Sequence, residues 1–156
     1  MAAFFDDPNA RAGLGPSEAD VPFLAELSPP EWDRLVEMTE RRLFQAGDVV
    51  MAGGDVDRSL YFVASGSVEV FVRQGHKEQS VQVLGPGSVL GEIAFFDGKP
   101  RSASVRALAD TELLRLSADA FEVLSARHPD LGRKILLDLG RVLALRLRHT
   151  EARHGG

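Results

Sequence analysis

The segment Gly91-Glu-Ile-Ala-Phe-Phe-Asp-Gly-Lys-Pro-Arg-Ser-Ala-Ser-Val105 combines features that suit a small sugar phosphate. Gly91 allows close approach of the backbone. A short helix after it would offer the unpaired N–H groups of its first turn to an anion. The Glu92 carboxylate can only accept hydrogen bonds, which suits a ribose hydroxyl. The Arg101 guanidinium can bind two phosphate oxygens at once.

Short β-rich runs lie on both sides of this segment, and turn residues divide them. Glycine, aspartate, serine and proline separate the runs, as at Gly53-Gly54-Asp55 and Gly85-Pro86-Gly87. Strands this short and this evenly punctuated predict a small antiparallel roll or barrel. The expected strands contain 43–44, 49–51, 60–63, 68–72, 81–83, 103–107 and 111–116.

Helical patterns precede and follow the β-rich region. Ser28 and Glu31 form a capping-box pair at the start of one helix, and Trp32 has the spacing of a packing anchor. Ser117 can cap a later helix that stops near His128, and Pro129 can begin the last helix, to about His149. The predicted class is α+β, one domain divided as follows: a flexible arm 1–16, N-terminal helices 17–41 with one opened by Ser17, a β-roll 42–117, C-terminal helices 118–149 and a frayed tail 150–156.

Composition narrows the functional class. The 156 residues suit one domain with a real core, and the absence of cysteine excludes disulfides and thiolate metal sites. A net charge of −5 argues against general binding to nucleic acid. No secretory signal and no membrane span are recognisable, which predicts a soluble cytoplasmic protein. The four histidines lack metal-ligand spacing and no catalytic triad is recognisable, so we expect neither an enzyme nor a metal or cofactor.

Three linked motifs carry a family resemblance. Leu60-Tyr-Phe-Val63 precedes Gly66-Ser-Val-Glu-Val70, Leu84-Gly-Pro-Gly87 comes next, and Arg101-Ser-Ala103 follows Gly91-Glu92 with nine positions from Glu92 to Arg101. Over roughly residues 35–148 the chain resembles cyclic nucleotide-binding domains, found in catabolite-activator-type regulators, regulatory subunits of cyclic-AMP-dependent kinase and cyclic-nucleotide-gated channels. The resemblance implies an antiparallel β-roll, jelly-roll-like, flanked by N-terminal helices and two C-terminal helices.

In that family the equivalent of residues 91–105, here named the cassette, holds the phosphate, and the resemblance carries its roles over by position. Glu92 would accept from the ribose 2′-hydroxyl, and Arg101 would pair with the cyclic phosphate. Ser102 would add a hydroxyl donor, and Ala103 a backbone N–H. The other expected ligand-binding residues are Gly91, Ile93 and Ala94 at the cassette helix and Val70, Val81 and Gln82 on strands beside the base.

The resemblance predicts a sensor that couples ligand occupancy to movement of the last helix. The expected ligand is cyclic AMP, because Ser102 stands where threonine in the family often accompanies a preference for cyclic GMP. Cyclic GMP is the alternative. A second hypothesis is an interaction protein that keeps the roll without responding to nucleotide, against which the intact Glu92 and Arg101 argue. Val70 and Val81 could equally be simple core, and Phe95-Phe96 either fill core or tighten the pocket.

The last helix is expected to transmit ligand binding to a partner. Arg146 lies near the position where the family places a base-contacting residue, and a guanidinium can stack on a purine, although a solvated positive face is the alternative. The wide apolar stripe could lie against the roll, pair with a second copy as a homodimer, or both. We expect a protein effector and no direct DNA binding, since about seven residues follow the helix, too few for a helix-turn-helix.

Overall fold

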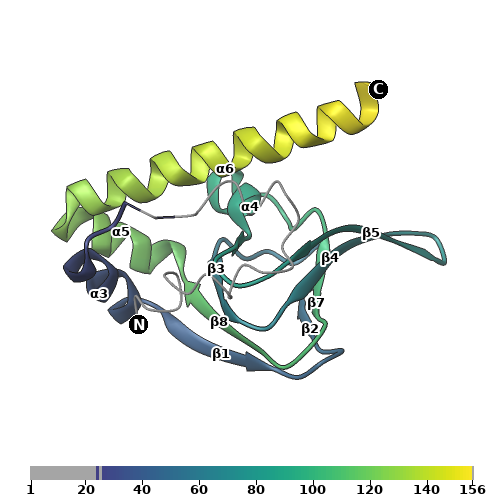
Figure 1. The fold of residues 1–156 in the computed structure, drawn as a ribbon, viewed down its shortest axis with the longest axis horizontal. Coiled ribbons are helices and arrows are strands. Elements are labelled where there is room, and N and C mark those ends of the chain that lie inside the picture. The colour runs from purple at the N-terminus through teal and green to yellow at the C-terminus, as the bar shows by residue number, and fades with distance from the viewer. Residues whose placement is uncertain (1–23, 25, 156) are drawn as a thin grey trace.

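A β-roll lies beneath a long C-terminal helix in the computed structural model, which describes residue 24 and residues 26–155, with side chains to 149 (Figure 1). The predicted arm 1–16 and most of the helix predicted from Ser17 lie outside the described residues. Among the described helices none is long and apolar enough to cross a membrane.

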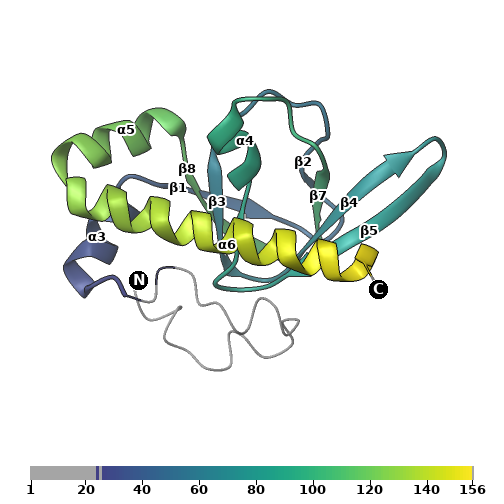
Figure 2. The same cartoon turned by 90° about the horizontal axis from the view of Figure 1, so that it is seen from above.

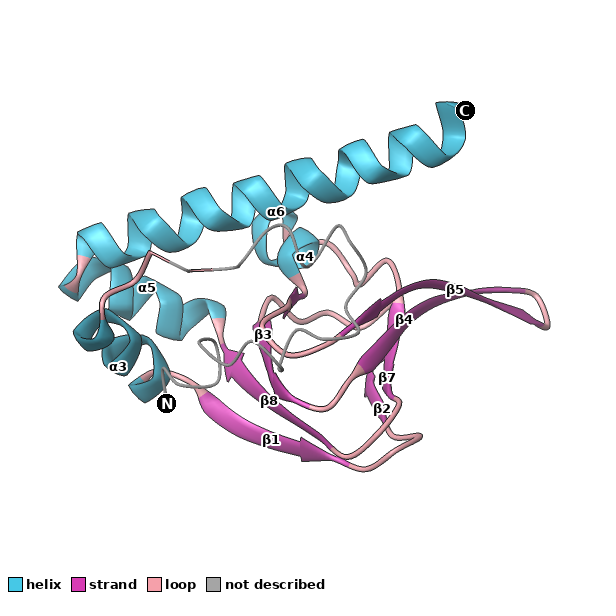
Figure 3. Ribbon diagram, in the orientation of Figure 1, coloured by secondary structure: helices cyan, strands magenta, loops and turns pink. Residues whose placement is uncertain are grey.

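The roll consists of two four-stranded antiparallel sheets (Figure 3). The first sheet has the order β1-β8-β3-β6 and the second β2-β7-β4-β5. This confirms the predicted antiparallel β-roll. The strands are β1 (Glu40–Phe44), β2 (Val49–Met51), β3 (Leu60–Ser65), β4 (Val68–Gln74), β5 (Lys77–Leu84), β6 (Val89–Leu90), β7 (Ser104–Ala107) and β8 (Thr111–Leu116).

Strand β3 separates two hydrophobic cores. Successive strand residues point to opposite faces, so Leu60 and Phe62 join the core under the helices, while Tyr61 and Val63 join the core between the sheets. A strand that is buried on both faces appears in sequence as a continuous apolar run, which explains the Leu-Tyr-Phe-Val pattern of β3.

The described helices are α3 (Pro29–Glu37), α4 (Glu92–Asp97), α5 (Ala118–Arg127) and α6 (Pro129–Gly155). The predicted capping box of α3 is present, with Ser28 Oγ accepting from Glu31 N at 3.4 Å and Glu31 Oε1 accepting from Ser28 N at 3.0 Å. Trp32 is buried in the core under the helices, as predicted for a packing anchor. Ser117 Oγ caps α5 by accepting from Ala120 N at 3.0 Å.

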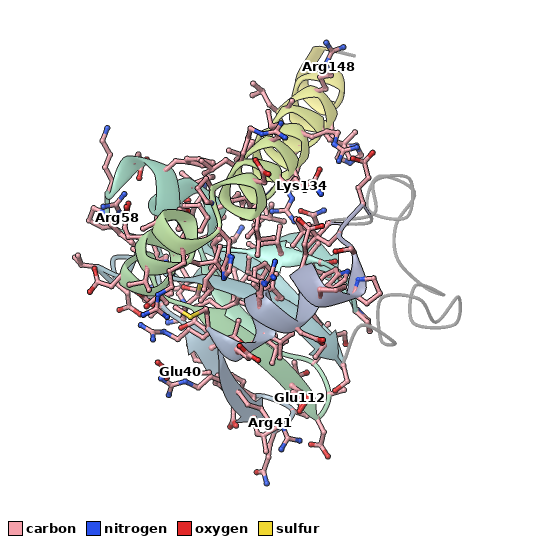
Figure 4. All side chains as sticks on the ribbon, turned by 90° about the vertical axis from the view of Figure 1, so that its left-hand side faces the viewer. Glu40, Arg41, Arg58, Glu112, Lys134 and Arg148 are labelled. Carbon is pink, nitrogen blue, oxygen red and sulfur yellow. The ribbon has the colours of Figure 1, made fainter. Side chains whose placement is uncertain are left out.

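Helix α6 runs across the α5 side of the molecule and continues over α4 (Figures 1 and 2). Lys134 of α6 pairs with Glu31 of α3 at 3.0 Å and lies toward α3 in Figure 4, which links the first and last described helices. The helix extends to Gly155 rather than ending near His149, because the intervening residues include no glycine or proline to interrupt it.

Leu24 differs from the helical conformation predicted for it. It lies in a turn with a φ of 58°, and its side chain is fully buried in the core under the helices. Its backbone N–H donates to Asp138 Oδ2 of α6 at 2.7 Å. This tertiary contact, which sequence pattern could not indicate, satisfies the buried backbone donor.

Gly132 allows the close contact of α5 with α6, and we expect Gly132→Ala to lower the free energy of unfolding by about 1–3 kcal/mol. A Cβ at this position would lie 2.5 Å from Ser125 Oγ and 2.9 Å from Ser125 Cβ. Gly140→Ala is the matched control on the same helix, since a Cβ there meets nothing within 4 Å. In the control, the free energy of unfolding should rise by roughly 0.5–1 kcal/mol, because alanine has a higher helix propensity than glycine. Urea denaturation measures both, and equal effects would contradict the packing explanation.

Candidate ligand-binding site

Gly91 turns the chain from β6 into α4 with a left-handed backbone, at a φ of 85°. Glycine is suited to that conformation because it lacks a Cβ. A second left-handed glycine, Gly98, ends the helix with its N–H donating to Ala94 O at 2.9 Å. Arg58, labelled beside this helix in Figure 4, also donates to its Phe95 O at 2.9 Å. The C-terminal end of the short cassette helix is therefore held by a backbone hydrogen bond and by the Arg58 side chain.

The backbone of Arg101 is anchored to the loop between β2 and β3. Its N–H donates to Asp55 O at 2.8 Å, and its carbonyl accepts from Gly54 N at 2.9 Å. Gly53 N donates to Ser104 Oγ at 2.8 Å a few residues further on. Two segments almost fifty positions apart in sequence thus determine where the Arg101 side chain begins.

The Arg101 guanidinium is buried, with only 3% of its side chain exposed. Nη1 donates to Gly91 O at 3.1 Å, and Nη2 donates to Ser59 O at 2.9 Å. Nη2 also lies 3.4 Å from Asp57 Oδ2. Among the described residues Nε has no hydrogen-bond partner. A buried charged donor that is held largely by neutral carbonyls retains capacity for an anion.

Glu92 is also buried, and its partner comes from the last helix. Arg146 Nη1 lies 2.7 Å from Glu92 Oε1, and Arg146 Nη2 donates to Val89 O at 2.8 Å. The guanidinium thus joins α6 to the start of the cassette and to β6. Arg146, for which a base contact is predicted, contacts in this structure the carboxylate predicted to bind the ribose. Glu92 and Arg101 have separate partners.

A β-bulge decides which strand residues face the interior beside the cassette. The register pairs Val70 with Gln82 and then Phe71 with Ser80, so Val81 falls at the irregularity. Since alternate residues share a face, Val70 and Gln82 share theirs with the buried Leu84. Val70 and Gln82 are half-buried, whereas Val81 is 42% exposed. The register places Gln82, rather than Val81, opposite Val70.

The remaining predicted residues differ in exposure. Ala94 is buried and Ala103 half-buried, while Ser102 is exposed and Ile93 is 50% exposed. The two phenylalanines of the cassette also separate. Phe95 is buried and makes an edge contact with Phe121 of α5 at 5.2 Å, so it fills core, while Phe96 is 43% exposed.

Asp57 and Ser59 adjoin Arg101, and sequence patterns did not identify them. Asp57 Oδ1 accepts from Ser59 N at 3.0 Å and from Ser59 Oγ at 2.8 Å. Aspartate commonly bonds the backbone two residues on, so Asp-x-Ser was the available signal. Burial alone would raise the pKa of Asp57, but the Ser59 hydrogen bonds and the charges of Arg101 and Arg115 hold it below its ordinary value. Burial, with the Asp57 charge, raises the pKa of Tyr61.

The profile of the cyclic nucleotide-binding domain family matches residues 41–128, which include both sheets, the cassette and α5. This match covers more than half of the chain. The chain belongs to the cyclic nucleotide-binding domain family. The resemblance read from the three sequence motifs is thereby confirmed.

Similar proteins share this domain in different surroundings. A cyclic AMP receptor protein of Thermus thermophilus is 37% identical over 131 residues, which cover 83% of this chain and 59% of that protein. Glutaminase 2 of Bradyrhizobium diazoefficiens is 37% identical over 130 residues, 83% of this chain but only 20% of that protein. The chain therefore spans less than two thirds of either relative.

Solved structures agree with the fold. The crystal structure of the Thermus thermophilus catabolite activator protein has a TM-score of 0.76 at 36% identity, covering 86% of this chain and 62% of that one. A cyclic nucleotide-binding domain from Methylobacillus flagellatus has a TM-score of 0.78 at 29% identity, covering 86% of this chain and 76% of that one.

Proposed function

We propose that this cyclic nucleotide-binding domain is a sensor for cyclic AMP that transmits occupancy through α6. The observation that carries the proposal is the contact of Arg146 with Glu92, because it joins the cassette to the last helix in one ion pair. A ribose hydroxyl that donates to Glu92 would share that carboxylate with the Arg146 guanidinium. Binding and helix position are then linked through shared contacts.

The chemistry of the cassette supports a cyclic phosphate as the anion. Arg101 supplies a buried fork with an unpartnered Nε among the described residues, and Glu92 supplies an acceptor. Relatives support adenine as the base, since similar proteins include the cyclic AMP receptor protein and a cAMP-dependent protein kinase regulatory subunit of Emericella nidulans, the latter 33% identical over 105 residues. The role that we propose for this domain is therefore ligand binding and not catalysis.

Calorimetry with cyclic AMP and cyclic GMP tests the ligand, and mass spectrometry of the purified protein identifies any nucleotide already bound. We expect a clear heat of binding with cyclic AMP and weaker binding of cyclic GMP. Tighter binding of cyclic GMP would reverse the base preference. Absence of binding by both would favour the alternative of an interaction protein that keeps the roll without responding to nucleotide.

Replacing Arg146 with glutamine should uncouple α6 while leaving nucleotide binding within about tenfold, because Arg101 and Glu92 remain. Hydrogen exchange measures the coupling. In the native protein, cyclic AMP should change exchange in the part of α6 around Arg146, and this response should disappear in the variant. Arg148→Gln is the matched control, since Arg148 is exposed on the same helix (Figure 4). Identical behaviour of the two variants would contradict coupling through the ion pair.

The output surface of α6 is the second part of the proposal. Leu136, Leu137 and Leu147 are 40%, 61% and 60% exposed, although leucine is usually buried. Such leucines suit the apolar face of another helix, from a second copy or from an effector protein. Light scattering with and without cyclic AMP distinguishes a homodimer from a monomer that awaits a separate partner.

A further inference from the structure

The loop between β2 and β3 places a carboxylate beside the buried arginine of the cassette. Asp57 Oδ2 lies 3.4 Å from Arg101 Nη2, and the Asp57 side chain is 31% exposed. The carboxylate therefore approaches the guanidinium from a partly solvated direction. Its neighbour Asp55 contacts Arg101 only through a backbone carbonyl, while its own carboxylate accepts from Ala52 N at 3.0 Å.

Asp57 is held in place by groups other than Arg101. Ser59 donates to its Oδ1 from both the backbone and the hydroxyl, Tyr61 donates to its Oδ2 at 3.4 Å, and Arg115 lies 3.8 Å from its Oδ1. None of these partners belongs to the cassette, so the position of the carboxylate beside Arg101 is fixed by β3, by the residue that precedes it and by β8. The hydrogen bonds and positive charges around it hold the pKa of Asp57 below its ordinary value despite burial, so the carboxylate is negatively charged at neutral pH.

The contact between the two side chains is loose. Strong charge-assisted hydrogen bonds between nitrogen and oxygen are roughly 2.7–2.9 Å long, whereas this pair is separated by 3.4 Å. Arg101 Nε has no partner among the residues that the structure describes. Asp57 thus offsets the charge of Arg101 without using up its donors, which leaves those donors for another anion.

We propose that Asp57 is a built-in counter-ion, which stabilises the buried Arg101 charge in the empty site and weakens the attraction of that charge for the ligand's phosphate. Asp57 acts on the ligand only through the charge of Arg101 and is assigned no contact with the ligand itself. The inference rests on the proposed function, because it takes the phosphate of a cyclic nucleotide as the incoming anion. A negative charge near the bound phosphate lowers affinity by Coulomb repulsion, and partial exposure screens part of the effect.

The test is Asp57→Asn, with Asp55→Asn as the matched control on the same loop. Asparagine can still accept from Ser59 and changes the charge with little change in shape. We expect Asp57→Asn to bind cyclic AMP about three- to tenfold more tightly at low salt, with the gain shrinking in 0.5 M salt. We also expect ligand-free Asp57→Asn to unfold at a lower temperature, because Arg101 loses its counter-ion. The control should change affinity by less than about twofold.

Calorimetry distinguishes the counter-ion role of Asp57 from an orienting role, from no role, and from failure of the proposed function. If Asp57→Asn binds cyclic AMP as the native protein does, or more weakly, the counter-ion role is wrong, because the carboxylate then orients Arg101 for the ligand or does nothing. A gain that is independent of salt would also contradict it. If the native protein binds no cyclic nucleotide, the proposed function fails first, and the separate result for the native protein makes the two failures distinguishable.

Discussion

Replacing Arg101 with alanine is expected to reduce affinity for cyclic AMP by about a hundredfold or more. Hydrogen bonds to charged groups contribute roughly 1.5–3 kcal/mol each, and a guanidinium fork can form two with one phosphate. The hydrogen-bond and ion-pair partners of this guanidinium among the described residues are the carbonyls of Gly91 and Ser59 and the Asp57 carboxylate, all of which are acceptors and none of which can replace it as a donor. Calorimetry measures the loss.

Two further variants separate loss of charge from loss of shape. Arg101→Lys keeps a positive charge but lacks the planar fork, so we expect an affinity between those of the native protein and Arg101→Ala. Arg42→Ala removes an exposed arginine of β1 that pairs with Glu40, and it should leave binding unchanged. Thermal unfolding of each variant confirms that it is folded. A loss of less than about tenfold for Arg101→Ala, or ~1.4 kcal/mol, would contradict the phosphate role.

Gly91→Ala is expected to lower the free energy of unfolding by roughly 2–5 kcal/mol, because a left-handed backbone and a steric collision act together. The φ of Gly91 is 85°, and a Cβ would lie 2.6 Å from both Arg101 Nη1 and Ser59 O. The collision is with the guanidinium itself and with the Ser59 carbonyl that accepts from it. Cyclic AMP affinity should therefore fall as well in molecules that remain folded. Urea denaturation and calorimetry measure the two effects.

Gly47→Ala is the control for backbone conformation alone. Its φ is 92°, close to that of Gly91, but a Cβ there meets nothing within 4 Å. We expect a loss of about 1–2 kcal/mol and unchanged affinity for cyclic AMP. Equal destabilisation by the two substitutions would mean that the left-handed backbone, and not the contact with Arg101, makes glycine necessary at position 91.

Local signals in the sequence were sufficient for the elements that depend on nearby residues. The capping box at Ser28, the cap at Ser117 and the start of α6 at Pro129 involve groups within four positions of one another, so they were predictable. Strand β6 was missed because two residues, Val89 and Leu90, are too short for a periodic signal. The extension of α6 beyond His149 was also missed, since residues 150–156 were predicted to be a frayed tail. These residues contain no glycine or proline before Gly155 that would end the helix.

In the candidate site, too, features set by residues close in sequence were predictable and contacts between distant residues were not. The spacing from Glu92 to Arg101 within a β-rich chain identified the cassette and, by resemblance, the family. The partners of those two side chains could not be predicted in this way. Asp57 is 44 positions from Arg101, and Arg146 is 54 positions from Glu92, and no periodic pattern links residues so far apart. The bulge that sets Gln82 opposite Val70 likewise depends on pairing between two strands.

By itself, the sequence determined the helix boundaries at Ser28, Ser117 and Pro129 and the continuous apolar run that makes β3 a buried strand. It also singled out Glu92 and Arg101 as the predicted ligand-binding pair. Only the tertiary structure decided which groups stabilise those two charges. Two carbonyls and the Asp57 carboxylate stabilise Arg101, and Arg146 stabilises Glu92. The physical reason is that caps and strand periods arise from neighbours along the chain, whereas a buried charge is stabilised by whichever groups the fold brings within a few ångströms.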